Sequence, residues 1–109
     1  MKIYSIRDHK AECFHRPFIT MNEQEALRNL YQVAMDKDTL FAHYPQDFAL
    51  YYLGEFDEKD GKLNPENPVH VTDILNLISS MNREYHRKNS DVVEEVKGEK
   101  EVYSNDLYE

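Results

Sequence analysis

The sequence predicts an α+β fold, a small antiparallel sheet of ββαββ order packed by one helix, followed by a C-terminal helix and a disordered acidic tail. Two observations predict it. Runs rich in β-branched and aromatic residues flank one helical stripe, and turn-forming residues separate the runs of each pair. The length of 109 residues suits one hydrophobic core. We therefore expect one domain over residues 1–88 and a tail over residues 89–109.

The first pair of strands is expected in residues 2–7 and 12–19, with a polar turn between them. In the second of these strands, the period of two puts Phe14 and Phe18 on one face. Pro17 cannot donate a hydrogen bond to a neighbouring strand, so this strand should lie at an edge or contain a bulge.

The first helix is expected over residues 22–35, because Thr20 and Asn22 are both good N-caps and are followed three residues later by Glu23 and Glu25, respectively. A second helix should begin at Thr72 or Asp73, which can also cap. Both helices carry an apolar stripe at helical spacing. The stripes are Ala26, Leu27, Leu30, Tyr31 and Ala34 in the first helix, and Ile74, Leu77, Ile78, Met81 and Tyr85 in the second.

The first helix is expected to end at residues 36–39, and residues 40–47, which lack a clear period and contain a proline, are expected to form a loop with hydrophobic anchors before the second pair of strands. Residues 48–56 are the strongest strand signal, and because their first half is apolar on both faces they are expected to form a central strand. Residues 57–62, which include a glycine, predict a hairpin turn. The return strand is expected to be short or to begin late, because Pro65 and Pro68 limit its pairing.

The cysteine count and the charge distribution limit the classes of protein to which the chain can belong. Cys13 is the single cysteine, so no disulfide forms within the chain, and we expect a cytoplasmic protein without a signal peptide or a membrane-spanning segment. The net charge of −8 argues against indiscriminate binding to DNA or anionic lipid. However, residues 1–20 hold four Lys and Arg against two acids, whereas residues 91–109 hold seven acids against two lysines. The N-terminal strands are therefore mildly basic.

Catalysis is not expected. The potential metal ligands His9, Cys13 and His15 lack a second pair at recognisable spacing, so the pattern favours ordinary strand residues over a zinc site. Cys13 has no evident base beside it for nucleophilic catalysis. The carboxylates of the 57–62 turn are typical of a solvated turn, and the chain has no glycine-rich phosphate loop. We expect a binding protein with no cofactor and no metal rather than an enzyme.

Basic residues alternate with aromatic residues near the N-terminus, as in proteins that hold single-stranded nucleic acid by stacking bases beside a basic groove. Most of these rings are equally well explained as core residues, so the spacing alone does not decide. Tyr4 is the stacking candidate. The full candidate set for nucleic-acid binding is Lys2, Tyr4, Arg7, Lys10, Arg16 and Arg28.

The chain resembles the small nonstructural protein family of gokushoviruses, single-stranded DNA phages of the Microviridae. The resemblance covers about residues 1–71 and rests on the order and spacing of several short segments. These segments are Ile3 to Asp8, Lys10 to Glu12, Pro17-Phe18, Glu25 to Arg28, His43 to Tyr51, Leu53 to Asp57 and Asp60 to Lys62.

The resemblance implies a nonstructural protein made in the infected bacterium, which binds single-stranded DNA or the replication or packaging machinery during genome synthesis. It carries over no catalytic residue. The helix from Thr72 and the acidic tail exceed the shorter members of the family. The alternative is an adaptor that binds a phage or host protein, with the tail acting as a nucleic-acid mimic or autoinhibitor. A homodimer is also compatible with the uncovered sheet face and the proline-marked edge.

Overall fold

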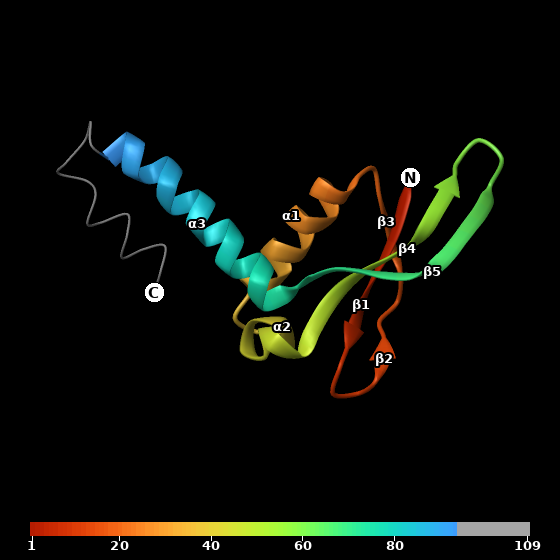
Figure 1. The fold of residues 1–109 in the computed structure, drawn as a ribbon, viewed down its shortest axis with the longest axis horizontal. Helices are drawn as coiled ribbons and strands as arrows, with labels where there is room; N and C mark the ends of the chain where they lie inside the picture. The colour runs from red at the N-terminus through yellow and green to blue at the C-terminus, as the bar shows by residue number, and fades with distance from the viewer. Residues whose placement is uncertain (94–109) are drawn as a thin grey trace. The chain divides into compact units, whose positions relative to one another are not determined.

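The structure is a computed structural model that describes the backbone of residues 1–93 and the side chains of residues 1–84. The chain divides into two compact units, Met1–Ile78 and Ser79–Glu109, and the strands that the structure describes all lie in the first (Figure 1). In chain order the elements are β1 (Lys2–Asp8), β2 (Cys13–Phe14), β3 (Phe18–Thr20), α1 (Glu23–Ala34), α2 (Leu40–His43), η1 (Pro45–Asp47), β4 (Phe48–Asp57), β5 (Lys62–Asp73) and α3 (Ile74–Val93).

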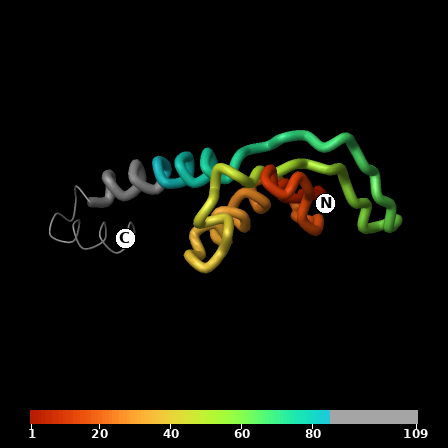
Figure 2. The backbone as a smooth tube through the Cα atoms, turned by 90° about the horizontal axis from the view of Figure 1, so that it is seen from below, coloured from red at the N-terminus to blue at the C-terminus, as the bar shows by residue number. Residues whose placement is uncertain are grey.

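The five strands form one antiparallel sheet in the order β2-β1-β4-β5, with β3 also paired to β1. Strand β4 lies between β1 and β5, which confirms the central position predicted from its apolar first half. Helices α1 and α2 lie on one side of the sheet (Figure 2). The predicted α+β class is therefore confirmed.

The core lies between the sheet and α1. Ile6 and Leu50 are paired in register on neighbouring strands, and both are buried. From the helix, Ala26, Leu30 and Ala34 are buried, as the apolar stripe predicts.

Helix α1 begins as its capping residues predict. The side chain of Asn22 accepts a hydrogen bond of 2.9 Å from the backbone N–H of Glu25, which satisfies one of the donors left unpaired at a helix start. Glu25 reaches back to the backbone N–H of Met21, at 3.4 Å, rather than to the N-cap residue itself. Thr20 adds a bond from its hydroxyl to the carbonyl of Asn22, at 2.8 Å.

The second predicted strand is broken, and the break changes which side chains share a face. Phe14 pairs with Arg7, but Phe18 pairs with Tyr4, so the register slips by one residue at the segment that contains Pro17. A slip of one residue moves every following side chain to the other face. The prediction that Phe14 and Phe18 share a face is therefore wrong: Phe14 contacts Tyr51, whereas Phe18 stacks on Tyr4.

The loop predicted for residues 40–47 instead contains two short helices, α2 and η1. Thr39 caps α2, accepting a hydrogen bond of 3.3 Å from the backbone N–H of Ala42. The predicted hydrophobic anchors are present, because the Phe41 ring packs edge to face on Phe48 with the centroids 4.7 Å apart. The short helices were missed because four residues are too few to show a helical period.

Strand β5 is also longer than predicted, running over 12 residues through both prolines. The β4–β5 register shifts twice, and Pro68 lies within one of the shifts while Pro65 pairs with Gly54. Because a bulge removes residues from the regular ladder, a proline there does not end the strand. The hairpin turn before it is confirmed: Gly61 has a φ of +71° and its N–H donates to the carbonyl of Asp57 at 2.7 Å.

Helix α3 begins at Ile74, directly after Asp73, and extends to Val93. Ile74 and Leu77 of its stripe are buried, whereas the side chain of Tyr85 is outside the described residues. From residue 94 onward the expected tail also lies outside them, and the boundary at residue 88 stays a prediction. Within the described part of the chain, no helix is both long enough and apolar enough to cross a membrane.

Candidate nucleic-acid interface

Three rings lie in a row on the side of the sheet opposite α1, which we call the open face. They are Phe14 of β2, Tyr51 of β4 and His70 of β5, and we call them the ring row. The centroids of Phe14 and Tyr51 are 5.3 Å apart, those of Tyr51 and His70 are 5.5 Å apart, and each pair meets edge to face at 83°. Phe14 is 38% exposed, so solvent reaches the row.

A small residue allows the rings of β2 and β4 to meet across the strand between them. Ser5 of β1 pairs with Tyr51, so its side chain points to the same face, but it is fully buried. Its hydroxyl donates a hydrogen bond of 2.6 Å to the backbone carbonyl of His15. The serine therefore ties β1 to the segment after β2, and a larger side chain at this position would separate the rings.

A cation lies beside the row. Arg7 pairs in register with Phe14, and its guanidinium carbon is 5.5 Å from the centroid of the Phe14 ring. An arginine over a ring is held by attraction to the ring face, which also orients its remaining donors. A positive group and exposed rings on one surface are the components that single-stranded nucleic-acid sites combine.

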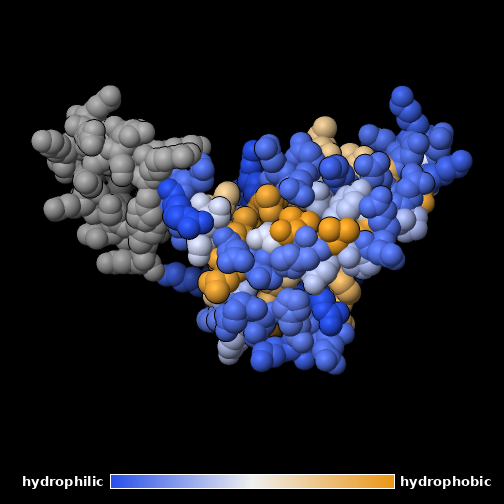
Figure 3. Space-filling model, viewed as in Figure 1, coloured by the Kyte–Doolittle hydropathy of each residue, from blue (hydrophilic) through white to orange (hydrophobic). Residues whose placement is uncertain are grey.

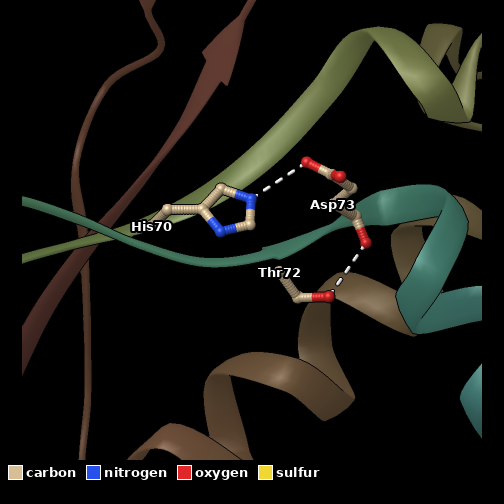
Figure 4. A network of polar contacts seen from close by, with 3 residues as sticks. All are labelled: His70, Thr72 and Asp73. Carbon is tan, nitrogen blue, oxygen red and sulfur yellow. Dashed lines mark hydrogen bonds and ion pairs between the residues drawn. The ribbon is translucent and has the colours of Figure 1, made fainter.

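The other end of the row carries a polar pair. The Nε2 atom of His70 lies 2.9 Å from Oδ1 of Asp73, and both side chains are about half exposed, at 48% and 42% (Figure 4). The hydroxyl of Thr72 donates to the backbone carbonyl of Asp73 at 3.0 Å. Asp73 is the last residue of β5, so it is anchored where the strand becomes a helix.

The space-filling view shows hydrophobic side chains gathered over the middle of the sheet region, with hydrophilic side chains around them (Figure 3). Isolated exposed apolar residues are usual on protein surfaces, whereas large contiguous apolar patches are typical of interaction sites. Exposed apolar side chains of the strands include Phe14, Ile19, Leu63 and Val69.

The structure distributes the six sequence-predicted binding residues over different surfaces. Arg7 is on the open face, and Lys10 is in the exposed turn between β1 and β2. Lys2 instead lies over the Tyr52 ring, 5.8 Å from its centroid. Arg28 is exposed on α1. The predicted set does not converge on one surface.

Arg16 lines a different feature, a half-open groove of about 340 Å³ between α1 and the segment after β2. The groove walls are mostly apolar. They are formed by Ile6, His15, Arg16, Phe18, Asn29, Leu30, Val33 and Phe41.

Tyr4 does not offer a ring face for stacking, because it is fully buried beneath α1 between Phe18 and Tyr52. Burial, together with the negative charge of Glu23 and the neighbouring Tyr52, raises the pKa of the Tyr4 hydroxyl above its ordinary value. The exposed ring row instead contains Tyr51 and Phe14. Strand alternation shows that Tyr51 and Tyr52 must face opposite sides, but it does not show which of them faces the open side.

The potential metal ligands Cys13 and His15 have different surroundings. Cys13 is exposed, whereas the His15 ring packs against Phe41, with the ring centroids 5.6 Å apart, and against Phe48, at 6.0 Å. Among the residues that the structure describes, no group of three or more His, Cys, Asp or Glu side chains could hold a metal ion.

The fold and the site define a small α+β protein whose antiparallel sheet is covered by a helix on one face and carries exposed rings on the other. A family model described as "Phage ORF5 protein" matches residues 1–77, and the chain belongs to this family. It is similar to Protein ORF5 of Chlamydia phage 1, with 35% identity over 78 residues, which cover 68% of this chain and 81% of that protein. No solved structure matches the chain.

The family match confirms the resemblance to the small gokushovirus proteins of the Microviridae. The matched residues, 1–77, nearly coincide with the first compact unit, Met1–Ile78. The ring row, Arg7 and Asp73 all lie within the matched part of the chain.

Proposed function

We propose that this phage protein is a nonstructural, non-enzymatic protein that binds single-stranded DNA on the open face of its sheet during genome synthesis or packaging. It would act in the cytoplasm of the infected bacterium. The observation that carries the proposal is the contiguous arrangement of Arg7, Phe14 and Tyr51, in which a guanidinium lies over an exposed ring beside a second ring.

The energetics favour a single strand over a duplex. Stacking of an unpaired base on an aromatic side chain contributes about 1 to 3 kcal/mol, because every base has a π face. In a duplex the faces of the bases are already covered by their neighbours, so rings on a sheet cannot reach them without unstacking. The same argument predicts little sequence preference, because none of the contacts depends on the edge of a particular base.

The test is a fluorescence-polarisation titration of the full chain with a labelled single-stranded oligonucleotide at several low salt concentrations. Phe14→Ala should weaken binding about fivefold or more, which corresponds to the lower end of the stacking range. Arg7→Gln should reduce the slope of log affinity against log salt by about 0.7, because one phosphate contact is lost.

Tyr44→Ala is the matched control, since Tyr44 is also an exposed aromatic residue but lies in the α2–η1 segment. It should bind like the wild type. Absence of binding by the wild type at low salt would reject the proposal, and so would equal losses in Phe14→Ala and Tyr44→Ala.

A further inference from the structure

A register shift in the sheet brings His70 to the open face. Leu50 pairs with Thr72, but the next residue, Tyr51, pairs with His70, so Val71 is an extra residue in β5. In a regular ladder Tyr51 would oppose Val71, and His70 would point to the helix side. A bulge of this kind re-aims a side chain, and here it completes the ring row.

The same shift creates the pair with Asp73. Residues three apart in a regular strand point to opposite faces. Because Val71 is extra, His70 and Asp73 point to the same face, and their side chains meet at 2.9 Å (Figure 4). Asp73 thereby fixes the orientation of the imidazole ring, whose other nitrogen, Nδ1, points away from the carboxylate (Figure 4).

We propose that His70, oriented by Asp73, is a phosphate contact of the open face that operates when the imidazole is protonated. This inference rests on the proposed function, and it assigns to the same site a second cation that is controlled by pH. With Nε2 bonded to the carboxylate, protonation turns Nδ1 into a donor for a phosphate oxygen.

The charges around the His70 imidazole determine whether DNA binding tightens or weakens with pH. His70 faces the carboxylate of Asp73 and the ring of Tyr51. Arg7 lies on the same face, because Ala49 of β4 pairs with Arg7 on one side and with Asp73 on the other. With a neutral imidazole the His70–Asp73 pair carries the negative charge of its carboxylate, which offsets the positive charge of Arg7 on the same face. Protonation of the imidazole cancels that charge, so binding should be tighter at acidic than at alkaline pH.

The experiment measures the salt dependence of single-stranded oligonucleotide binding at pH 6.0 and pH 8.2, both above the isoelectric point of about 5.1. In the wild type, the slope of log affinity against log salt should be steeper at the lower pH by about 0.5, slightly less than one full phosphate contact. His70→Gln, which cannot carry the charge, should show the same slope at both pH values.

His43→Gln is the matched control, because His43 is an exposed histidine in α2. It should retain the wild-type difference between the two slopes. Asp73→Asn keeps an oxygen acceptor for the imidazole and should retain the pH effect, whereas Asp73→Ala should reduce it. This comparison distinguishes a positioning role of Asp73 from a merely structural one. Circular dichroism of each variant checks independently that the fold is retained.

The outcomes distinguish the two proposals. If the wild type binds DNA but His70→Gln keeps the same pH-dependent slope, the assignment of His70 is overturned while the proposed function stands. If Asp73→Ala gains as much affinity on acidification as the wild type, Asp73 does not position the ring. If the wild type does not bind single-stranded DNA at either pH, both proposals fail.

Discussion

At the scale of single residues, Tyr4 and Arg7 are three positions apart on β1 and face opposite sides of the sheet. Tyr4 points to the helix side and is fully buried, whereas Arg7 points to the open face and lies over Phe14. Both were expected to serve one nucleic-acid site because an aromatic residue beside a cation suggests stacking. Strand alternation places residues three apart on opposite faces, so only one of them can serve it.

Replacing Tyr4 with Phe tests the burial of its hydroxyl. Within the described part of the chain this oxygen is buried without a hydrogen-bond partner. Tyr4→Phe should therefore leave the free energy of unfolding unchanged or raise it by up to about 1 kcal/mol, as urea denaturation would measure. A loss of about 1 kcal/mol or more, relative to Tyr44→Phe as control, would show that the hydroxyl is bonded.

The same residue predicts a change of stability at alkaline pH. The pKa of Tyr4 is raised in the folded protein, so its contribution is complete below the unfolded value of about 10 and is lost as the pH rises through the folded value. The free energy of unfolding should therefore fall above pH 10, and Tyr4→Phe should fall less steeply. If the free energy of unfolding fell equally steeply with pH in the wild type and in Tyr4→Phe, the decrease would not come from Tyr4.

At the scale of elements, the β4–β5 pair depends on a glycine at a close approach of two backbones. Gly54 has a φ of +138°, and a Cβ added there would lie 2.3 Å from the carbonyl oxygen of Asn64 and 2.9 Å from the Cα of Pro65. Gly61 in the hairpin turn also has a positive φ, but nothing lies within 4 Å of its added Cβ. Substitutions at the two glycines therefore distinguish the cost of a steric clash from the cost of backbone strain.

Gly54→Ala should lower the free energy of unfolding by roughly 2 kcal/mol or more, because backbone strain and a clash with fixed backbone atoms combine. Gly61→Ala, with strain alone, should cost about 1 kcal/mol. Urea denaturation of both variants measures the difference. Equal costs would mean that β5 moves aside at Pro65 without penalty.

The elements also show what sequence patterns can and cannot predict here. Asn22 with Glu25, the apolar run at the start of β4 and the turn at Gly61 are local signals, and each predicted its element. The slip at Pro17 and the extra residue Val71 are features of pairing between strands, which no single segment records. Because these two irregularities decide which rings share the open face, the ring row could not be predicted from alternation within one strand.

At the scale of the whole molecule, the net charge of −8 must be compatible with a DNA-binding face. The ring row lies near the end of the sheet where Arg7 and Lys10 are, whereas the acidic 57–62 turn follows β4 at the other end. Asp57 lies six positions after Tyr51, which corresponds to about 20 Å of strand at ~3.3 Å per residue. This exceeds the screening length of about 8 Å at physiological salt, so the distant carboxylates should act weakly on the row.

The central claim is that single-stranded DNA lies on the open face, and photo-crosslinking tests it most directly. The full chain would be irradiated with an oligonucleotide that carries 5-iodouracil, and the attached residue identified by fragment mass spectrometry. The account predicts attachment to Phe14, Tyr51 or His70, with loss of the signal at high salt. Attachment confined to Tyr44, or to residues that line the groove beside α1, would contradict it.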